Sequence, residues 1–146
     1  MKLPILILGI IVVIIITFLT LNYFLPKNPQ AEIKGHTFSL YIAKTTSEQE
    51  IGLAKYKTIG MSQGMLFLFA KSDYYSFWMK GMHFPIDIIF INGNKVIDIF
   101  PAVPIATNDA LPTYTTKGKA DKVLEINSGL TKNYKIKIGD RVNLSL

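Results

Sequence analysis

Residues 64–91 of this 146-residue chain, GMLFLFAKSDYYSFWMKGMHFPIDIIFI, decide the fold. The segment holds three apolar runs of strand length, which are separated by polar residues, glycine and proline. Lys80 and Asp87 are polar exceptions among its aromatic and aliphatic side chains. We expect three consecutive strands here, and we expect them to form the centre of a β-rich domain.

Further short strands are expected on both sides of this segment. Residues 31–43 alternate apolar and polar positions around Lys34-Gly35, which is typical of a hairpin. Asn-Gly-Asn at 92–94 is a strong turn signal. A long loop is expected over residues 101–120. The remaining apolar runs predict strands at 95–100, 123–127, 134–138 and 141–146.

The sequence also predicts one short helix after the first hairpin. Ser47 and Glu50 have the three-residue spacing of a capping box, in which each side chain bonds to the other residue's backbone N–H. Counted on both sides of this helix, about eight or nine short strands are expected in total, with turns between them. This pattern indicates a mainly β fold, a compact β-sandwich or barrel with a jelly-roll-like arrangement.

The N-terminal segment differs from this domain. Residues 3–25 include no charged side chain over 23 positions, and about 20 apolar residues suffice for a helix to cross a bilayer. A cleaved signal peptide is the alternative, but its apolar core is usually only about 7–15 residues long. We therefore predict a membrane anchor at 1–27, a single-pass transmembrane helix in the cell membrane with the domain outside the cytoplasm. Residues 28–35 are then a short linker with the first strand, and residues 36–146 a single β domain.

Charge and cysteine content exclude several functions. Without Lys2 and Lys27, residues 28–146 carry 14 basic and 10 acidic residues, a net charge of +4. The lysines are scattered rather than clustered, so no nucleic-acid surface is indicated. The absence of cysteine excludes disulfides, thiol nucleophiles and thiolate metal sites. His36 and His83 lack spaced partners, so no metal is predicted, and no cofactor motif occurs.

Four residues of the aromatic segment are candidate ligand-binding residues: Tyr75, Trp78, Lys80 and Asp87. Tyr75 and Trp78 offer aromatic surface for a sugar ring or a lipid tail. The strand of Asp87 has two apolar faces, so the carboxylate is expected to be buried and to need partners. Asp87 either pairs with Lys80, caps loop amides near residues 81–84, or stands at the mouth of a cavity.

Glu125 is a further candidate, on a later strand. It shares a face with Val123 and Asn127, where alternation predicts exposure to solvent. If it met Asp87, the two carboxylates could perform acid–base chemistry on a sugar-like substrate, with Lys80 stabilising charge. Asp87, Glu125 and Lys80 are therefore the catalytic candidates.

The order of several short motifs resembles the domain of unknown function 192 family over about residues 36–146. These motifs are Gly52-Leu53, Gly64-Met65-Leu66-Phe67, Phe77-Trp78-Met79-Lys80, Pro85 to Phe90, Leu124-Glu125 and Gly129. The resemblance implies a compact, mostly β protein, often behind a signal or anchor segment, with no established activity. The chain departs from the family pattern at Gln49 and Tyr56, where arginines are usual, and at Gly81-Met82, where Asn-Thr is usual. If those family residues bind a ligand, this chain lacks part of that site.

The sequence thus predicts an extracytoplasmic binding or accessory module without catalytic motifs. Its expected partners are an envelope glycan, a lipid or a protein, in addition to the bilayer around residues 3–25. One alternative is an envelope hydrolase that uses Asp87 and Glu125 as acid and base with Lys80. Another is a purely structural partner of a second membrane protein.

Overall fold

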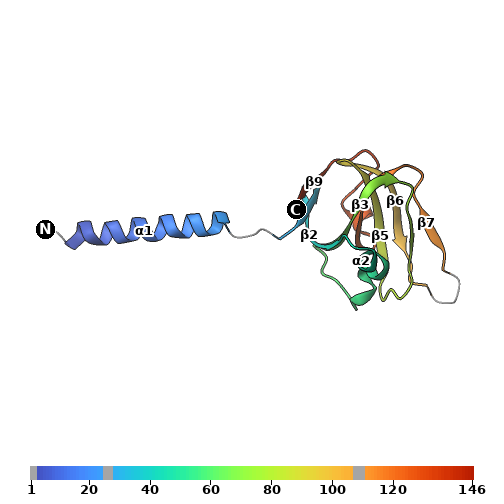
Figure 1. Ribbon diagram of the computed structural model, residues 1–146, viewed down its shortest axis with the longest axis horizontal. Coiled ribbons are helices and arrows are strands. Elements are labelled where there is room, and N and C mark those ends of the chain that lie inside the picture. Colours follow the sequence, from blue (N-terminus) through green and yellow to red (C-terminus); the bar gives the residue numbers. More distant parts are fainter. Residues whose placement is uncertain (1–2, 25–27, 107–110) are drawn as a thin grey trace.

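The computed structural model describes residues 3–24, 28–106 and 111–146, and within the first of these ranges it describes the side chains of residues 7–20. The N-terminal helix α1 (Leu3–Phe24) stands apart from the β domain that contains the other elements (Figure 1). Among the residues with described side chains, no helix is both long and apolar enough to cross a membrane. The anchor predicted at 1–27 also includes residues 1–2 and 25–27, which lie outside the described residues.

The described part of the β domain contains nine strands and three short helices. The strands are β1 (Gln30–Ile33), β2 (His36–Ala43), β3 (Gln63–Asp73), β4 (Ser76–Trp78), β5 (Ile86–Asn92), β6 (Lys95–Val103), β7 (Thr113–Thr115), β8 (Ala120–Asn127) and β9 (Val142–Ser145). The helices are α2 (Thr46–Ile51), the 3₁₀ turn η1 (Gly52–Lys55) and α3 (Leu130–Asn133). The mainly β prediction is confirmed.

Seven strands form one curled sheet in the order β6-β5-β8-β3-β2-β1-β9, while β4 pairs with β7 in a separate two-stranded sheet. Strands β2 and β3 run parallel. The edge strands β6 and β9 approach each other where Lys95 faces Arg141. There the N–H of Val96 donates to the carbonyl of Asp140 at 3.0 Å. The sheet therefore curls into a half-barrel (Figure 1), whereas the sequence left both a sandwich and a barrel open.

Each face of the central strands β5, β8 and β3 buries an apolar layer. Leu66, Ile89 and Leu124 belong to the core inside the half-barrel. Their sequence neighbours Phe67 and Ile88 belong to a second core on the outer face. Side chains from η1, β4 and β7 cover this outer layer, among them Leu53, Phe77 and Tyr114. The prediction that β5 is buried on both faces is confirmed.

The predicted helix forms, although a different pair of residues caps it. Thr45 is the N-cap of α2, and its hydroxyl accepts from the N–H of Glu48 at 3.3 Å. The Glu48 carboxylate accepts in turn from the N–H of Thr45 at 2.9 Å. Bonds from the Thr45 and Lys44 backbone lower the pKa of Glu48, because they favour its charged form. The capping box is thus Thr45–Glu48, not Ser47–Glu50.

The structure also corrects the predicted strand at 134–138. Helix α3 ends at Asn133, and Lys135 has a φ of 55°, a left-handed conformation that interrupts an extended chain. Ile136 is buried and Ile138 is exposed, so the apolar alternation that suggested a strand reflects a turn. The predicted loop at 101–120 contains the end of β6 and the short strand β7.

The three strands of the opening segment are not neighbours in one sheet. Strand β8, which is far along the chain, lies between β3 and β5, and β4 belongs to the second sheet. Gly64 allows β3 and β8 to approach closely, because a Cβ at this position would lie 2.7 Å from the carbonyl oxygen of Glu125. The close approach brings β8 into the centre of the fold.

Candidate ligand-binding pocket

A pocket of about 230 Å³ lies between the outer face of the sheet and the segments that cover it. Its lining combines aromatic and aliphatic side chains with a few polar groups, as is usual for small-molecule sites. The lining residues are Thr46, Gln49, Glu50, Ile51, Gly52, Leu53, Phe67, Phe69, Tyr75, Ser76, Phe77, Trp78, Lys80, Met82 and Glu125.

Glu125 is the buried ionisable group of this pocket. It is only 4% exposed, and its neighbours across the sheet are Met65 and Ile88. Within the described residues, its Oε2 atom is buried and has no hydrogen-bond partner. Burial raises the pKa of Glu125 from 4.5 to about 8, because the charged form loses its hydration. The prediction that Glu125 faces solvent is therefore wrong, since β4 and the α2–η1 segment cover its face of the sheet.

Gly52 keeps the space beside this carboxyl open. Its φ is 53°, on the side of the Ramachandran plot that glycine adopts readily. A Cβ at this position would lie 3.3 Å from Cζ of Phe67 and 4.0 Å from Oε2 of Glu125. Any larger residue would therefore crowd the volume next to the unpartnered oxygen.

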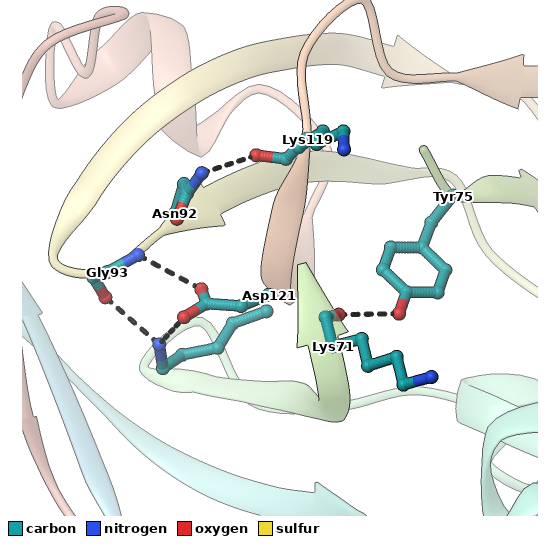
Figure 2. A network of polar contacts seen from close by, with 7 residues as sticks. Lys71, Tyr75, Asn92, Gly93, Lys119 and Asp121 are labelled. Carbon is teal, nitrogen blue, oxygen red and sulfur yellow. Dashed lines mark hydrogen bonds and ion pairs between the residues drawn. The ribbon is translucent and has the colours of Figure 1, made fainter. Parts of the chain in front are cut away.

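Aromatic rings in fixed positions form the walls of the pocket. Phe69 and Tyr75 stack with ring centres 3.7 Å apart, and Phe67 meets Phe77 edge to face at 4.9 Å. The Tyr75 hydroxyl donates to the carbonyl of Lys71 at 2.7 Å (Figure 2). Burial raises the pKa of Tyr75, with the negative charge of Asp73 as a second cause. Tyr75 therefore contributes a neutral, positioned ring.

A polar cluster links the β5–β6 turn to β8. The Asp121 carboxylate accepts from the N–H of Gly93 at 3.1 Å and contacts the ammonium of Lys122 at 2.8 Å (Figure 2). Lys122 also donates to the carbonyl of Gly93 at 3.0 Å. These bonds connect the β5–β6 turn to the strand that carries Glu125, so the carboxyl sits on a firmly held element.

The mouth of the pocket is partly apolar and carries one charge of each sign. Trp78 and Ile51 are about half exposed, at 48% and 50%. The exposed Lys80 places its Nζ atom 5.9 Å from the centre of the Trp78 ring, a cation–π contact. Glu50 is the exposed acidic residue of the lining. The structure thus brings together four of the predicted site residues: Tyr75, Trp78, Lys80 and Glu125.

Asp87 does not join them. It is fully buried, and its carboxylate accepts four hydrogen bonds. The donors are the N–H groups of Ala102 and Gly129, at 2.7 and 3.0 Å, and both the N–H and the hydroxyl of Thr131, at 2.7 Å each. These bonds connect β5 to the start of α3 and to Ala102 in β6, where the backbone has a φ of 52°. Backbone amides are its partners, as one of the three roles held, but they belong to β6, Gly129 and α3 rather than to residues 81–84.

The register of the sheet separates the two carboxylates. Ile88 lies opposite Glu125 in the β5–β8 pair, whereas Asp87 lies opposite Ile126. Adjacent positions on a strand point to opposite faces, so Asp87 is on the half-barrel side and Glu125 on the pocket side. In the described residues no ion pair links Asp87 to Lys80. The acid–base arrangement of Asp87, Glu125 and Lys80 is therefore not formed.

Sequence reasoning did not assign a site role to the α2–η1 residues. Gln49 donates from Nε2 to the carbonyl of Leu68 at 2.9 Å, which fastens α2 to β3 beside the pocket. Glu50 and Gly52 line the pocket, together with Phe67 and Phe69. The available signal was the Gly52-Leu53 motif, which precedes the aromatic segment and which the fold places against it.

The fold and the pocket define a mainly β, half-barrel domain with a cavity of small-molecule size. The sequence profile of the DUF192 family, described as an uncharacterized ACR, matches residues 29–144, and the chain belongs to this family. No curated protein gives a significant sequence match.

Two solved structures share the fold. A protein of unknown function from Novosphingobium aromaticivorans is 32% identical, with a TM-score of 0.71 over 79% of this chain and 82% of that one. A protein from Sinorhizobium meliloti, described as a putative transcription regulator, is 24% identical, with a TM-score of 0.70 over 80% of this chain and 91% of that one. The second likeness concerns the fold alone.

Proposed function

We propose that this protein is a ligand-binding module of the cell envelope whose pocket holds a small molecule with an apolar body and one polar group. The observation that carries the proposal is the unpartnered Oε2 of Glu125 inside an aromatic pocket. A buried polar atom without a partner costs roughly 1–3 kcal/mol. A ligand that bonds to this atom would recover that free energy.

The dimensions of the pocket support a ligand with a single ring. An apolar cavity of about 150 Å³ accepts benzene, and this pocket has about 230 Å³. The rings of Phe69, Tyr75 and Phe77 supply flat apolar walls, and Trp78 extends them to the surface. Such a site fits one ring with a short polar arm.

Trp78 provides the first test, because it is the single tryptophan of the chain and it lines the pocket. Titration with 2-phenylethanol, phenethylamine, phenylacetate or methyl glucoside is expected to change its fluorescence saturably for at least one probe. Calorimetry is then expected to show roughly 3- to 10-fold weaker binding in Trp78→Ala, since an aromatic contact is lost.

Tyr74→Ala is the matched control, because Tyr74 is 57% exposed and does not line the pocket. Its affinity should stay within about twofold of the wild type. If none of the four probes binds saturably up to about 10 mM, the small-ligand function is wrong, and a structural role beside another membrane protein becomes the better account.

The second part of the proposal is that α1 tethers this module to the cell membrane, with the domain outside the cytoplasm. It is supported by the uncharged segment at 3–25 and by the exposure of the apolar side chains from Ile7 to Leu19 in α1. Water-exposed helices of this composition are unfavourable, whereas a bilayer would solvate them.

Membrane fractionation tests the tether. The full chain is expected to stay in the membrane pellet after alkaline carbonate washing, whereas a chain that begins at residue 28 should be released. Protease added outside intact spheroplasts should digest the domain while a cytoplasmic marker survives. Release of the full chain by carbonate would contradict the tether without affecting the pocket.

A further inference from the structure

We propose that the Glu125 pocket selects an organic cation, a protonated amine or quaternary ammonium group on an apolar body, as its ligand. The inference rests on the proposed binding function and names the ligand class. It follows from three features of the pocket: the buried acceptor, the aromatic walls and the distribution of charge at the mouth.

The buried acceptor is the first feature. Oε2 of Glu125 has no partner among the described residues, and Gly52 leaves the neighbouring volume free of side chain. A carboxylate in such a position gains most from a positively charged donor, because charge-assisted hydrogen bonds are about twice as strong as neutral ones. A ligand ammonium next to this oxygen would form an ion pair shielded from water.

The aromatic walls are the second feature. The faces of aromatic rings carry negative potential and attract cations, and the pocket walls consist largely of such rings, including Phe69, Tyr75 and Trp78. The protein already uses one of them in this way, since Lys80 lies over Trp78. An anionic ligand would meet the negative faces of these rings, which disfavour it.

The charges around Glu125 are the third feature. The segment after β4 contributes Lys80, α2 contributes Glu50, and Tyr75 precedes β4 with its hydroxyl bonded to Lys71. The lining residues from β3 are Phe67 and Phe69, which are uncharged. Lys80 and Glu50 are exposed, opposite in sign and screened by solvent. Glu125 is therefore the buried ionisable group whose charged form decides the preference of the pocket.

Binding of a cation requires the Glu125 carboxyl to lose its proton. The folded protein holds Glu125 protonated below about pH 8, so an ammonium ligand forms its ion pair as the carboxyl releases one proton to solvent. The affinity for a cation is therefore expected to rise as the pH increases towards 8 and then to level off. A neutral or anionic ligand would prefer the protonated carboxyl and would show the opposite trend or none.

Matched single-ring probes test the inference in the full chain. Phenethylamine keeps its charge from pH 6 to pH 8, since alkylamines titrate near 10 as lysine does (about 10.4). We expect it to bind more tightly than 2-phenylethanol or phenylacetate, with affinity rising roughly tenfold between pH 6.5 and 7.5. Glu125→Gln should weaken amine binding roughly 10- to 100-fold and abolish its pH dependence. The control Glu32→Gln, at an exposed position of β1, should retain both.

A variant at the mouth separates cation from anion recognition. Lys80→Met removes a positive charge at the mouth of the pocket, so it should raise amine affinity by up to about threefold. The inference is wrong if phenylacetate or 2-phenylethanol binds more tightly than the amine, or if Glu125→Gln binds the amine as the wild type does. In those cases the proposed binding of a small ligand still stands. If none of the probes binds, both the binding function and the preference for a cation are contradicted.

Discussion

Replacing Asp87 with alanine is expected to lower the free energy of unfolding of the β domain by at least about 4 kcal/mol. The Asp87 carboxylate accepts from three backbone N–H groups and from the Thr131 hydroxyl. Alanine would leave these donors without partners, the two of Thr131 in a buried position and those of Ala102 and Gly129 in part-buried ones. Each buried unsatisfied group costs roughly 1–3 kcal/mol. Natural domains are stable by only about 5–15 kcal/mol, so the variant would be close to unfolded.

Urea denaturation followed by Trp78 fluorescence measures this effect, and the thermal midpoint should fall by roughly 15 °C or more. Asp73→Ala is the matched control. Asp73 is exposed and its carboxylate bonds only to the N–H of the adjacent Tyr74 among the described residues, at 2.9 Å. That control should change stability by less than about 0.5 kcal/mol. Equal midpoints for the two variants would contradict the structural role of Asp87.

Asp87→Asn separates a structural from a catalytic carboxylate. The asparagine amide has nearly the same shape, but its NH₂ group would face donors where Asp87 presents an acceptor oxygen. We expect a loss of stability of about 2 kcal/mol or more. A hydrolase based on Asp87 would instead lose activity at unchanged stability, and that outcome would revive the carboxylate-pair hypothesis.

Local patterns in the sequence predicted much of this fold. The sequence predicted that the strand of Asp87 has two apolar faces, and the two faces of β5 match the two apolar cores. Thr45–Glu48 and Ser47–Glu50 have the same spacing, so the sequence predicted the helix without identifying its cap. These features depend on residues that are close together in the chain, so a single sequence is enough to predict them.

Features that depend on pairing between distant strands were not predictable in this way. Alternation placed Glu125 on the same face of its strand as Val123, and it gave the strand of Asp87 two apolar faces. It cannot determine which faces of two neighbouring strands lie on the same side of the sheet. The register of Ile88 opposite Glu125 settles this question. Similarly, the packing of β4 and the α2–η1 segment over the outer face of the sheet buries a position that was predicted to face solvent. The aromatic residues of the pocket were recognisable from composition, whereas Glu50 and Gly52 required the docking of α2 and η1.

Replacing Glu125 with glutamine is expected to flatten the pH dependence of stability. The folded protein binds the Glu125 proton up to about pH 8, whereas the unfolded chain releases it near 4.5. Between these values the folded state holds more protons, so the contribution of Glu125 to stability is fully present below pH 4.5 and is lost as the pH rises through 8. The wild type should lose on the order of 3 kcal/mol from this group between pH 5 and pH 8. Glutamine does not titrate and should lose none of it.

Glu125→Leu measures how much the buried Glu125 carboxylate lowers the free energy of unfolding. At pH 8 leucine removes an unpartnered buried carboxylate and fills apolar surroundings, so this variant should be more stable than the wild type by at least about 2 kcal/mol. It should also lose ligand binding, because the acceptor atom is gone. Urea titrations at pH 5 and pH 8 measure both variants, and Glu32→Gln should keep the wild-type slope. A wild-type stability that is constant over this range would mean that the Glu125 carboxyl is solvated, and it would remove the free-energy gain on which ligand selection by this pocket depends.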